Sequence, residues 1–170
     1  GFGPEDAEKL LALSGTMKPG ERLFADANQA WSMVEATAFL RDVEAADLGW
    51  MEEPMPAYAP EAEWVELARL KVPLAGGENI AGFSDFDSAL ASGALGYVQP
   101  DVAKWGGITG CYEVARRTLA SGAVYCPHFL GGGIGLTASA HVLAAAGGDG
   151  LLEVDVNPNP LRAAFELTGR

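Results

Sequence analysis

The sequence predicts an α/β fold, a (β/α) barrel of the TIM type, and three observations support it. Short apolar runs alternate along the chain with longer segments that have helical periodicity. Each apolar run closes on a polar residue, and these residues recur every 23 to 27 positions, about the length of one strand, loop and helix. The series contains neither a GxGxxG motif nor a P-loop. It therefore favours a barrel over a doubly wound sheet.

Six strands are expected, and each ends on a polar side chain. They cover residues 22–26, 49–53, 73–78, 97–101, 123–128 and 151–155, and the side chains that recur at their ends are Asp26, Glu52, Glu78, Asp101, His128 and Glu153. Catalytic groups of (β/α) barrels lie at the carboxyl ends of the strands, so we expect these six to converge on one mouth. Taken singly, each could equally cap the next helix or be a solvated loop residue.

Helical segments fill the intervals between the strands. Apolar residues at i, i+3 and i+4 predict helices over 5–15, 31–49, 61–71, 84–95, 110–123 and 136–148. A complete barrel needs eight strands and typically about 250 residues. Six strands in 170 residues therefore predict that residues 1–170 are one partial, carboxyl-terminal barrel domain without its first strands.

Charge and composition argue against several classes of partner. The formal net charge of −12, with no local cluster of Lys or Arg, repels nucleic acid and anionic lipid. The longest uncharged stretch, 129–148, contains three consecutive glycines and is typical of a buried helix rather than a membrane span. Cys111 and Cys126 lack metal-binding spacing, and the first residues include acids where a signal peptide is basic. We expect a cytoplasmic protein with no nucleic-acid or membrane partner.

Asp26, Glu52 and Glu78 follow three successive strands and should bring three carboxylates into one volume. Their mutual repulsion requires a compensating cation. Oxygen ligands with positions left open for water and substrate suit Mg²⁺, whereas zinc prefers nitrogen and sulfur. We therefore expect one Mg²⁺. Glu53 competes with Glu52 for the ligand role, but neighbouring strand residues face opposite ways, and the regular spacing favours Glu52.

Asn28 comes two residues after Asp26. It is a candidate hydrogen-bonding partner for a metal ligand or for the substrate, and the alternative is a loop residue that stabilises the turn.

Asp101 and His128 end the next two expected strands. A carboxylate can accept a hydrogen bond from one imidazole nitrogen and leave the other basic, so His128 is interpreted as a general base oriented by Asp101. The alternative is a histidine that only caps the glycine-rich loop at 131–133. Glu153, kept protonated by burial, could donate a hydrogen bond to a substrate oxygen; the alternative is a surface acid beside Asp155.

A metal ion beside a His/Asp pair is suited to removing a weakly acidic proton next to a carboxylate. The divalent cation stabilises the enediolate as its charge develops. Hydrolysis by a metal-bound water is also chemically possible, but the histidine-rich sites that such barrels generally use for it are not found among the two histidines of the chain.

In five ordered segments the chain resembles the enolase superfamily and, within it, the mandelate racemase subgroup. The segments are DANQAW at 26–31, WMEEP at 50–54, GGEN at 76–79, QPDVAKWGGIT at 99–109 and PHFLGGGIG at 127–135. The resemblance implies a modified (β/α)₇β barrel and a separate α+β capping domain, which residues 1–170 lack. It also implies roles for seven residues: Mg²⁺ ligands Asp26, Glu52 and Glu78, base pair His128 and Asp101, substrate-carboxylate contact Glu153, and Lys104 as the lysine common in the sixth-strand motif.

The resemblance also limits the classes of reaction to be expected. The muconate-lactonizing and dipeptide-epimerase subgroup carries a catalytic lysine where this chain has Asp101, so the pattern points to racemases, which are isomerases, and to acid-sugar dehydratases, which are lyases. Racemisation needs bases on both faces of the substrate, whereas His128 alone can take the α-proton and help a β-hydroxyl leave.

We therefore expect a Mg²⁺-dependent acid-sugar dehydratase, with a racemase or epimerase as the alternative. The expected partner is a small hydroxycarboxylate or acid sugar, and the full-length protein is expected to be a homo-oligomer. A hypothesis from another class is a truncated, non-catalytic barrel that binds metal.

Overall fold

A computed structural model describes residues 4–163 and residue 165, and the chain divides into two compact units. The first unit comprises the chain up to residue 76 together with 92–96. The second unit comprises 77–91 and the chain from 97 onward.

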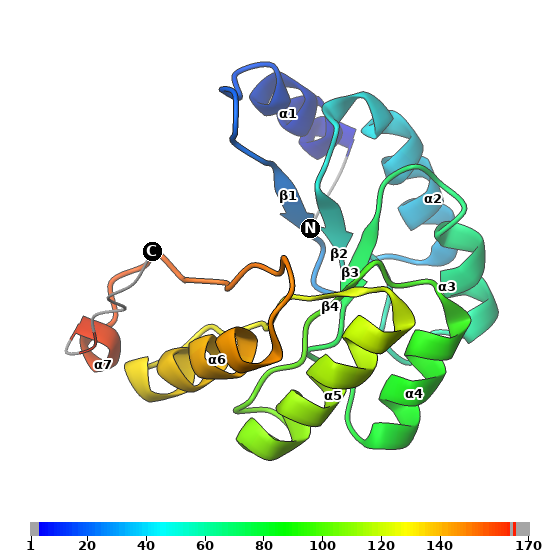
Figure 1. Cartoon of the computed structure of the whole chain (residues 1–170). Helices are drawn as coiled ribbons and strands as arrows, with labels where there is room; N and C mark the ends of the chain where they lie inside the picture. The colour runs from blue at the N-terminus through cyan, green and yellow to red at the C-terminus, as the bar shows by residue number, and fades with distance from the viewer. Residues whose placement is uncertain (1–3, 164, 166–170) are drawn as a thin grey trace. The chain divides into compact units, whose positions relative to one another are not determined.

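The first unit repeats a strand followed by a helix. Its elements are α1 (Pro4–Ser14), β1 (Phe24–Asp26), α2 (Met33–Asp42), the 3₁₀ turn η1 (Glu44–Ala46), β2 (Trp50–Glu52), α3 (Glu61–Leu67) and β3 (Leu74–Gly76). The three strands are parallel and lie side by side in chain order (Figure 1). The register places Asp26 opposite Glu52, and Glu52 opposite Ala75.

Local sequence and burial explain these elements. Ser32 and Glu35 form a capping box at the start of α2: the Ser32 backbone N–H donates to the Glu35 carboxylate at 2.8 Å, and the Glu35 N–H donates to Ser32 Oγ. Leu40 of α2, Met51 of β2 and Leu67 of α3 are almost completely buried in one apolar core. Burial of each such side chain contributes about 1.5–3 kcal/mol.

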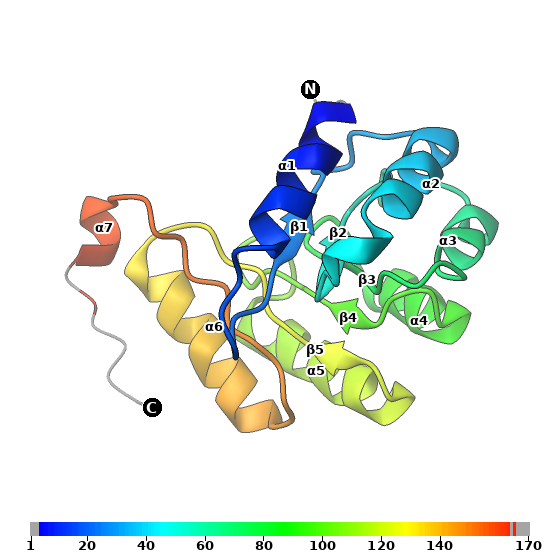
Figure 2. The same cartoon turned by 90° about the horizontal axis from the view of Figure 1, so that it is seen from above.

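The second unit contains the remaining elements. They are α4 (Phe83–Ser92), β4 (Tyr97–Val98), α5 (Gly107–Ser121), β5 (Val124–Tyr125), α6 (Gly133–Ala146) and α7 (Pro160–Ala163). Strands β4 and β5 are parallel, with Val98 opposite Tyr125. Helices α5 and α6 pack side by side in both views (Figure 1, Figure 2). Tyr125, Cys111 and Val142 form the buried core of this unit.

Five of the six expected strands are present at the expected places, and the sixth is not. Residues 151–155 contain no strand, although all five are described. The backbone N–H of Leu151 donates to Cys126 Sγ at 3.3 Å instead of to a strand carbonyl. The helix expected over 31–49 is also shorter than predicted: α2 ends at Asp42, and η1 follows it and is capped by Asp47, which is left-handed with φ 51°.

A helix that crosses a bilayer must be both long and strongly apolar. None within 4–163 and 165 meets both conditions for crossing a membrane.

Gly77 lies between β3 and Glu78, and its backbone conformation and close surroundings both require glycine. Its φ is +141°, and a Cβ there would come within 2.8 Å of the Gln99 backbone nitrogen. We expect Gly77→Ala to lower the free energy of unfolding by about 2 kcal/mol or more, through backbone strain and the clash with an immobile main chain. The measurement is urea denaturation followed by circular dichroism.

Gly82→Ala is the matched control for this substitution. Gly82 also has a positive φ of +98°, but a Cβ there would meet nothing within 4 Å. Only the backbone strain of the positive φ remains at this position, so we expect Gly82→Ala to lower the free energy of unfolding by about 1 kcal/mol. Equal losses for the two variants would show that the close approach of Gly77 to Gln99 does not constrain the fold.

Candidate active site

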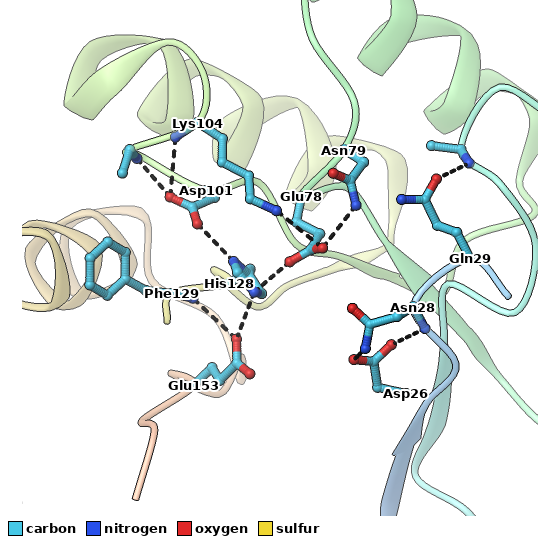
Figure 3. Close-up of polar contacts among 12 residues, drawn as sticks. Asp26, Asn28, Gln29, Glu78, Asn79, Asp101, Lys104, His128, Phe129 and Glu153 are labelled. Atoms are coloured by element: carbon cyan, nitrogen blue, oxygen red, sulfur yellow. Dashed lines mark hydrogen bonds and ion pairs between the residues drawn. The ribbon is translucent and has the colours of Figure 1, made fainter. Parts of the chain in front are cut away.

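The first unit places two acids at the ends of neighbouring strands. Asp26 ends β1 and Glu52 ends β2, and the register makes them partners. The Asp26 carboxylate accepts hydrogen bonds from the Asn28 backbone N–H at 2.7 Å and from the Asn28 side-chain amide (Figure 3). Glu52 is buried and accepts a hydrogen bond from Trp50 Nε1 at 3.2 Å. Both carboxylates are thus held in fixed orientations, and Asn28 contacts the expected metal ligand Asp26.

The loops that follow β1 and β2 continue the pairing of the strands in a strained backbone. Gln29 N–H donates to the Glu53 carbonyl at 2.7 Å, and Trp31 N–H donates to the Pro54 carbonyl at 3.1 Å. Asn28, Gln29 and Glu53 all have positive φ, at 47°, 60° and 35°. Such conformations cost of order 1–3 kcal/mol each in non-glycine residues and are concentrated at functional sites.

The strand alternation expected at Glu52 and Glu53 does not extend to Glu53 in the structure. Both side chains are buried, at 8% and 2% exposure. Strand β2 ends at Glu52, and the positive φ of Glu53 breaks the alternation at that point. Burial therefore does not distinguish the two acids.

The second unit brings Asp101 and His128 into contact. His128 Nδ1 lies 2.8 Å from Asp101 Oδ2, and both side chains are buried (Figure 3). The other oxygen of Asp101 accepts backbone hydrogen bonds from Ala103 at 2.7 Å and Lys104 at 3.3 Å. The turn after β4 thus fixes the carboxylate, and the carboxylate fixes the imidazole ring.

The second nitrogen of His128 faces two more acids. Nε2 forms an ion pair with Glu78 Oε2 and lies 3.6 Å from Glu153 Oε2. The other oxygen of Glu78 contacts Lys104 Nζ at 3.1 Å and the Asn79 side-chain amide at 2.8 Å (Figure 3). The ion pair between Glu78 and His128 was not expected from the sequence, because strand spacing does not say which way a side chain after the strand turns.

These contacts shift the pKa values of both partners. Burial alone would lower the pKa of His128, but the hydrogen bond to Glu78, the charges of Glu153 and Glu78, and the hydrogen bond to Asp101 outweigh it and raise the pKa to about 9. Burial opposes ionisation of Glu78, yet the hydrogen bonds and charges of His128 and Lys104 hold its pKa well below the usual range. The pair is therefore ionised at neutral pH.

Glu153 is not buried as the sequence interpretation required. Its side chain is 37% exposed, and Oε2 accepts a hydrogen bond from the Phe129 backbone N–H at 3.1 Å. The segment that carries it lies outside any strand. The burial on which the sequence interpretation of Glu153 depends is therefore absent, although the residue does reach His128.

Residues 4–163 and 165 contain no group of three or more His, Cys, Asp or Glu side chains arranged to hold a metal ion. The chemistry of the expected ligands nevertheless suits Mg²⁺. Asp26 and Glu52 offer carboxylate oxygens at paired strand ends. Glu78 offers a third carboxylate, which in this structure is engaged by His128 and Lys104.

The family follows from a comparison with known proteins. A family model described as enolase C-terminal domain-like matches residues 2–168. The chain belongs to this family. The enolase-type barrel expected from the sequence is thereby confirmed, and several structural neighbours carry the mandelate racemase name that the resemblance indicated.

Three relatives illustrate the family. L-talarate/galactarate dehydratase of Salmonella typhimurium is 32% identical over 74% of this chain and 31% of its own length. A mandelate racemase/muconate lactonizing enzyme from Bordetella bronchiseptica RB50 has a TM-score of 0.90 and 50% identity, covering 94% of this chain and 45% of that one. L-talarate dehydratase from Polaromonas sp. JS666, complexed with Mg and L-glucarate, has a TM-score of 0.77 and 27% identity, covering 91% and 42%. The chain thus spans less than half the length of each.

The raised pKa of His128 makes stability depend on pH. A group whose pKa rises on folding contributes stability that is complete below the unfolded value of 6.5 and is lost as the pH rises through about 9. In EDTA, we expect the stability advantage of the wild-type protein over His128→Asn to shrink between pH 6 and pH 9.5, by on the order of 2 kcal/mol. Urea denaturation at several pH values measures it.

His141→Asn is the control for this pH dependence, because His141 lies exposed on α6. We expect its difference from wild type to stay small over the same range. An advantage over His128→Asn that is constant or grows with pH would contradict the charged ion pair.

Proposed function

We propose that this chain supplies the catalytic barrel of a Mg²⁺-dependent enzyme that abstracts the α-proton of a carboxylate through an enediolate, and that the reaction is dehydration of an acid sugar. The observation that carries the proposal is the buried His128, which Asp101 holds through Nδ1 at 2.8 Å and whose Nε2 faces Glu78 and Glu153. The names of the relatives, which include dehydratases, support the reaction class.

Asp101 gives His128 the tautomer that a base requires. When the neutral imidazole donates Nδ1–H to Asp101, its lone pair is on Nε2, which can take the α-proton. Asp101 then stabilises the imidazolium that forms. A general base in such a position contributes typically about 10²–10⁴-fold to the rate.

The base function also requires the neutral form of His128. The ion pair with Glu78 favours the protonated form, since it raises the pKa to about 9. The proposal therefore requires Glu78 to leave Nε2 in the working enzyme, as a carboxylate that serves as a metal ligand would.

We assign Asp26, Glu52 and Glu78 as the Mg²⁺ ligands. Mg²⁺ bound by them would stabilise the negative charge that develops on the substrate carboxylate. The two hydrogen bonds from Asn28 to Asp26 support a role for Asn28 in orienting this ligand, beside its expected role toward the substrate. Lys104, at 3.1 Å from Glu78, is assigned to the charge balance of the same carboxylate.

Glu153 is assigned to the substrate carboxylate. Its Oε2 lies 3.6 Å from His128 Nε2, so a substrate bound at that nitrogen would come within hydrogen-bonding reach of this carboxyl group.

Dehydration needs only one residue that moves protons. His128 Nε2 takes the proton from the α-carbon and returns it to the β-hydroxyl, the β-carbon–oxygen bond breaks, and water leaves with the formation of an enol that becomes the 2-keto-3-deoxy acid. A racemase is the second candidate, favoured by the structural neighbour from Bordetella bronchiseptica that carries this name. It would need another base opposite His128.

Substitution of the base tests the mechanism. The protein is incubated in D₂O with Mg²⁺ and a panel of acid sugars and hydroxy acids, and products are followed by proton NMR and mass spectrometry. Loss of water supports the dehydratase, whereas α-deuteration without loss of water supports the racemase. We expect His128→Asn to reduce either reaction by at least about 10³-fold, and His141→Asn to leave it unchanged. Retention of α-proton exchange in His128→Asn would overturn the assignment.

Metal binding is tested separately from catalysis. We expect EDTA to abolish the reaction and added Mg²⁺ to restore it. Asp26→Asn and Glu52→Gln should each weaken Mg²⁺ binding by about tenfold or more in isothermal titration calorimetry, because each removes a charged oxygen ligand. Glu44→Gln is the control, since Glu44 pairs with Lys71 on the surface. Equal Mg²⁺ affinity in all three variants would contradict the ligand assignment.

A further inference from the structure

The turn that carries Asp101 ends at Trp105. The Trp105 backbone N–H donates to the Asp101 carbonyl at 3.0 Å, and the Lys104 N–H donates to the same oxygen at 3.2 Å. The Asp101 carboxylate accepts from the backbone of the same turn through Oδ1, which leaves Oδ2 for His128. The direction of the carboxylate therefore depends on the conformation of residues 101–105.

The indole of Trp105 holds the far end of this turn against two helices. Phe83 of α4 contacts the indole edge to face, with ring centroids 5.1 Å apart, and the fully buried Phe86 lies at 5.4 Å. On α5, a Cβ at Gly110 would lie only 3.3 Å from the indole, so the ring packs directly on the helix backbone. The Trp105 carbonyl accepts a hydrogen bond from the Cys111 thiol at 3.4 Å.

An ion-pair network beside this packing joins α4 and α5. The Arg117 guanidinium lies 4.6 Å from the Phe83 ring centroid and pairs with Asp87 of α4 and Glu113 of α5. This network connects the two helices between which the indole lies. The aromatic contacts are each worth about 0.5–1.5 kcal/mol beyond burial, enough to select one conformation of a short turn.

We propose that Trp105 is a positioning residue for the Asp101–His128 pair. It acts through the turn, by keeping the Asp101 carboxylate directed at His128 Nδ1, and it touches neither reacting atoms nor substrate. The catalytic part of this inference depends on the proposed function, but the positioning of the imidazole can be measured independently.

The test uses the whole protein labelled with ¹⁵N-histidine. The His128 and His141 resonances are assigned by their loss in His128→Asn and His141→Asn. We expect Trp105→Leu to shift or broaden the His128 Nδ1–H resonance and to leave the His141 resonance unchanged. It should also lower kcat for α-proton exchange by about tenfold with little change in KM, because misplaced catalytic groups act mainly on the chemical step. Trp105→Phe, which keeps an aromatic ring, should recover most of both readouts.

Two further variants keep the inference falsifiable. Gly110→Ala adds a methyl group against the indole and favours the helix, so the protein should fold while the His128 resonance shifts. Trp64→Leu removes a tryptophan that packs on the core of the first unit and should leave the His128 resonance in place.

An unchanged His128 resonance in both Trp105→Leu and Gly110→Ala would overturn the inference, as would an equal shift in Trp64→Leu. A wild-type protein that is inactive on every substrate, but whose His128 resonance responds to Trp105, would count against the proposed function and not against the positioning role.

Discussion

Parallel pairing of very short strands is the constraint on which the rest of this structure depends. In the first unit, Phe24 opposite Trp50 places Asp26 opposite Glu52, and a slip of one residue would turn every side chain to the other face. Strands of two or three residues supply few hydrogen bonds. The register is therefore reinforced beyond the strand ends, by the Gln29 and Trp31 backbone groups that pair with the next loop. The register thus sets Asp26 opposite Glu52, and separate hydrogen bonds from Asn28 and Trp50 orient the two carboxylates.

The second unit brings several ionisable side chains around His128, and each of them has a hydrogen-bonding or ionic partner. It buries Asp101 and His128 and places Glu78 beside them in a chain of net charge −12. An isolated charge would be costly there, and each group has a partner: two backbone N–H groups and an imidazole for Asp101, and an imidazole and an ammonium group for Glu78. Each of these groups is thus compensated by its neighbours, and the groups that the proposed chemistry needs are kept close together.

The sequence predicted those features that depend on local pattern or on strand polarity. The positions of β1 to β5 and the approach of His128 to Asp101 both follow from them. The remainder depends on tertiary partners. Residues 151–155 have the composition of a strand, but Leu151 pairs with the sulfur of Cys126. The direction of Glu78 toward His128 and the burial of Glu53 depend on backbone angles after the strand ends, which no periodicity encodes.

Cys111 can report local opening of the structure around Asp101. Its thiol is completely buried, and burial, together with the charge of Asp101, raises its pKa to about 12. A thiol in that state is a poor nucleophile, so a modifying reagent reacts with it only after the surrounding structure has opened. Because Cys111 hydrogen-bonds to the carbonyl of Trp105, its rate of modification reports how often the polypeptide beneath Asp101 opens to solvent, without any label having to be introduced.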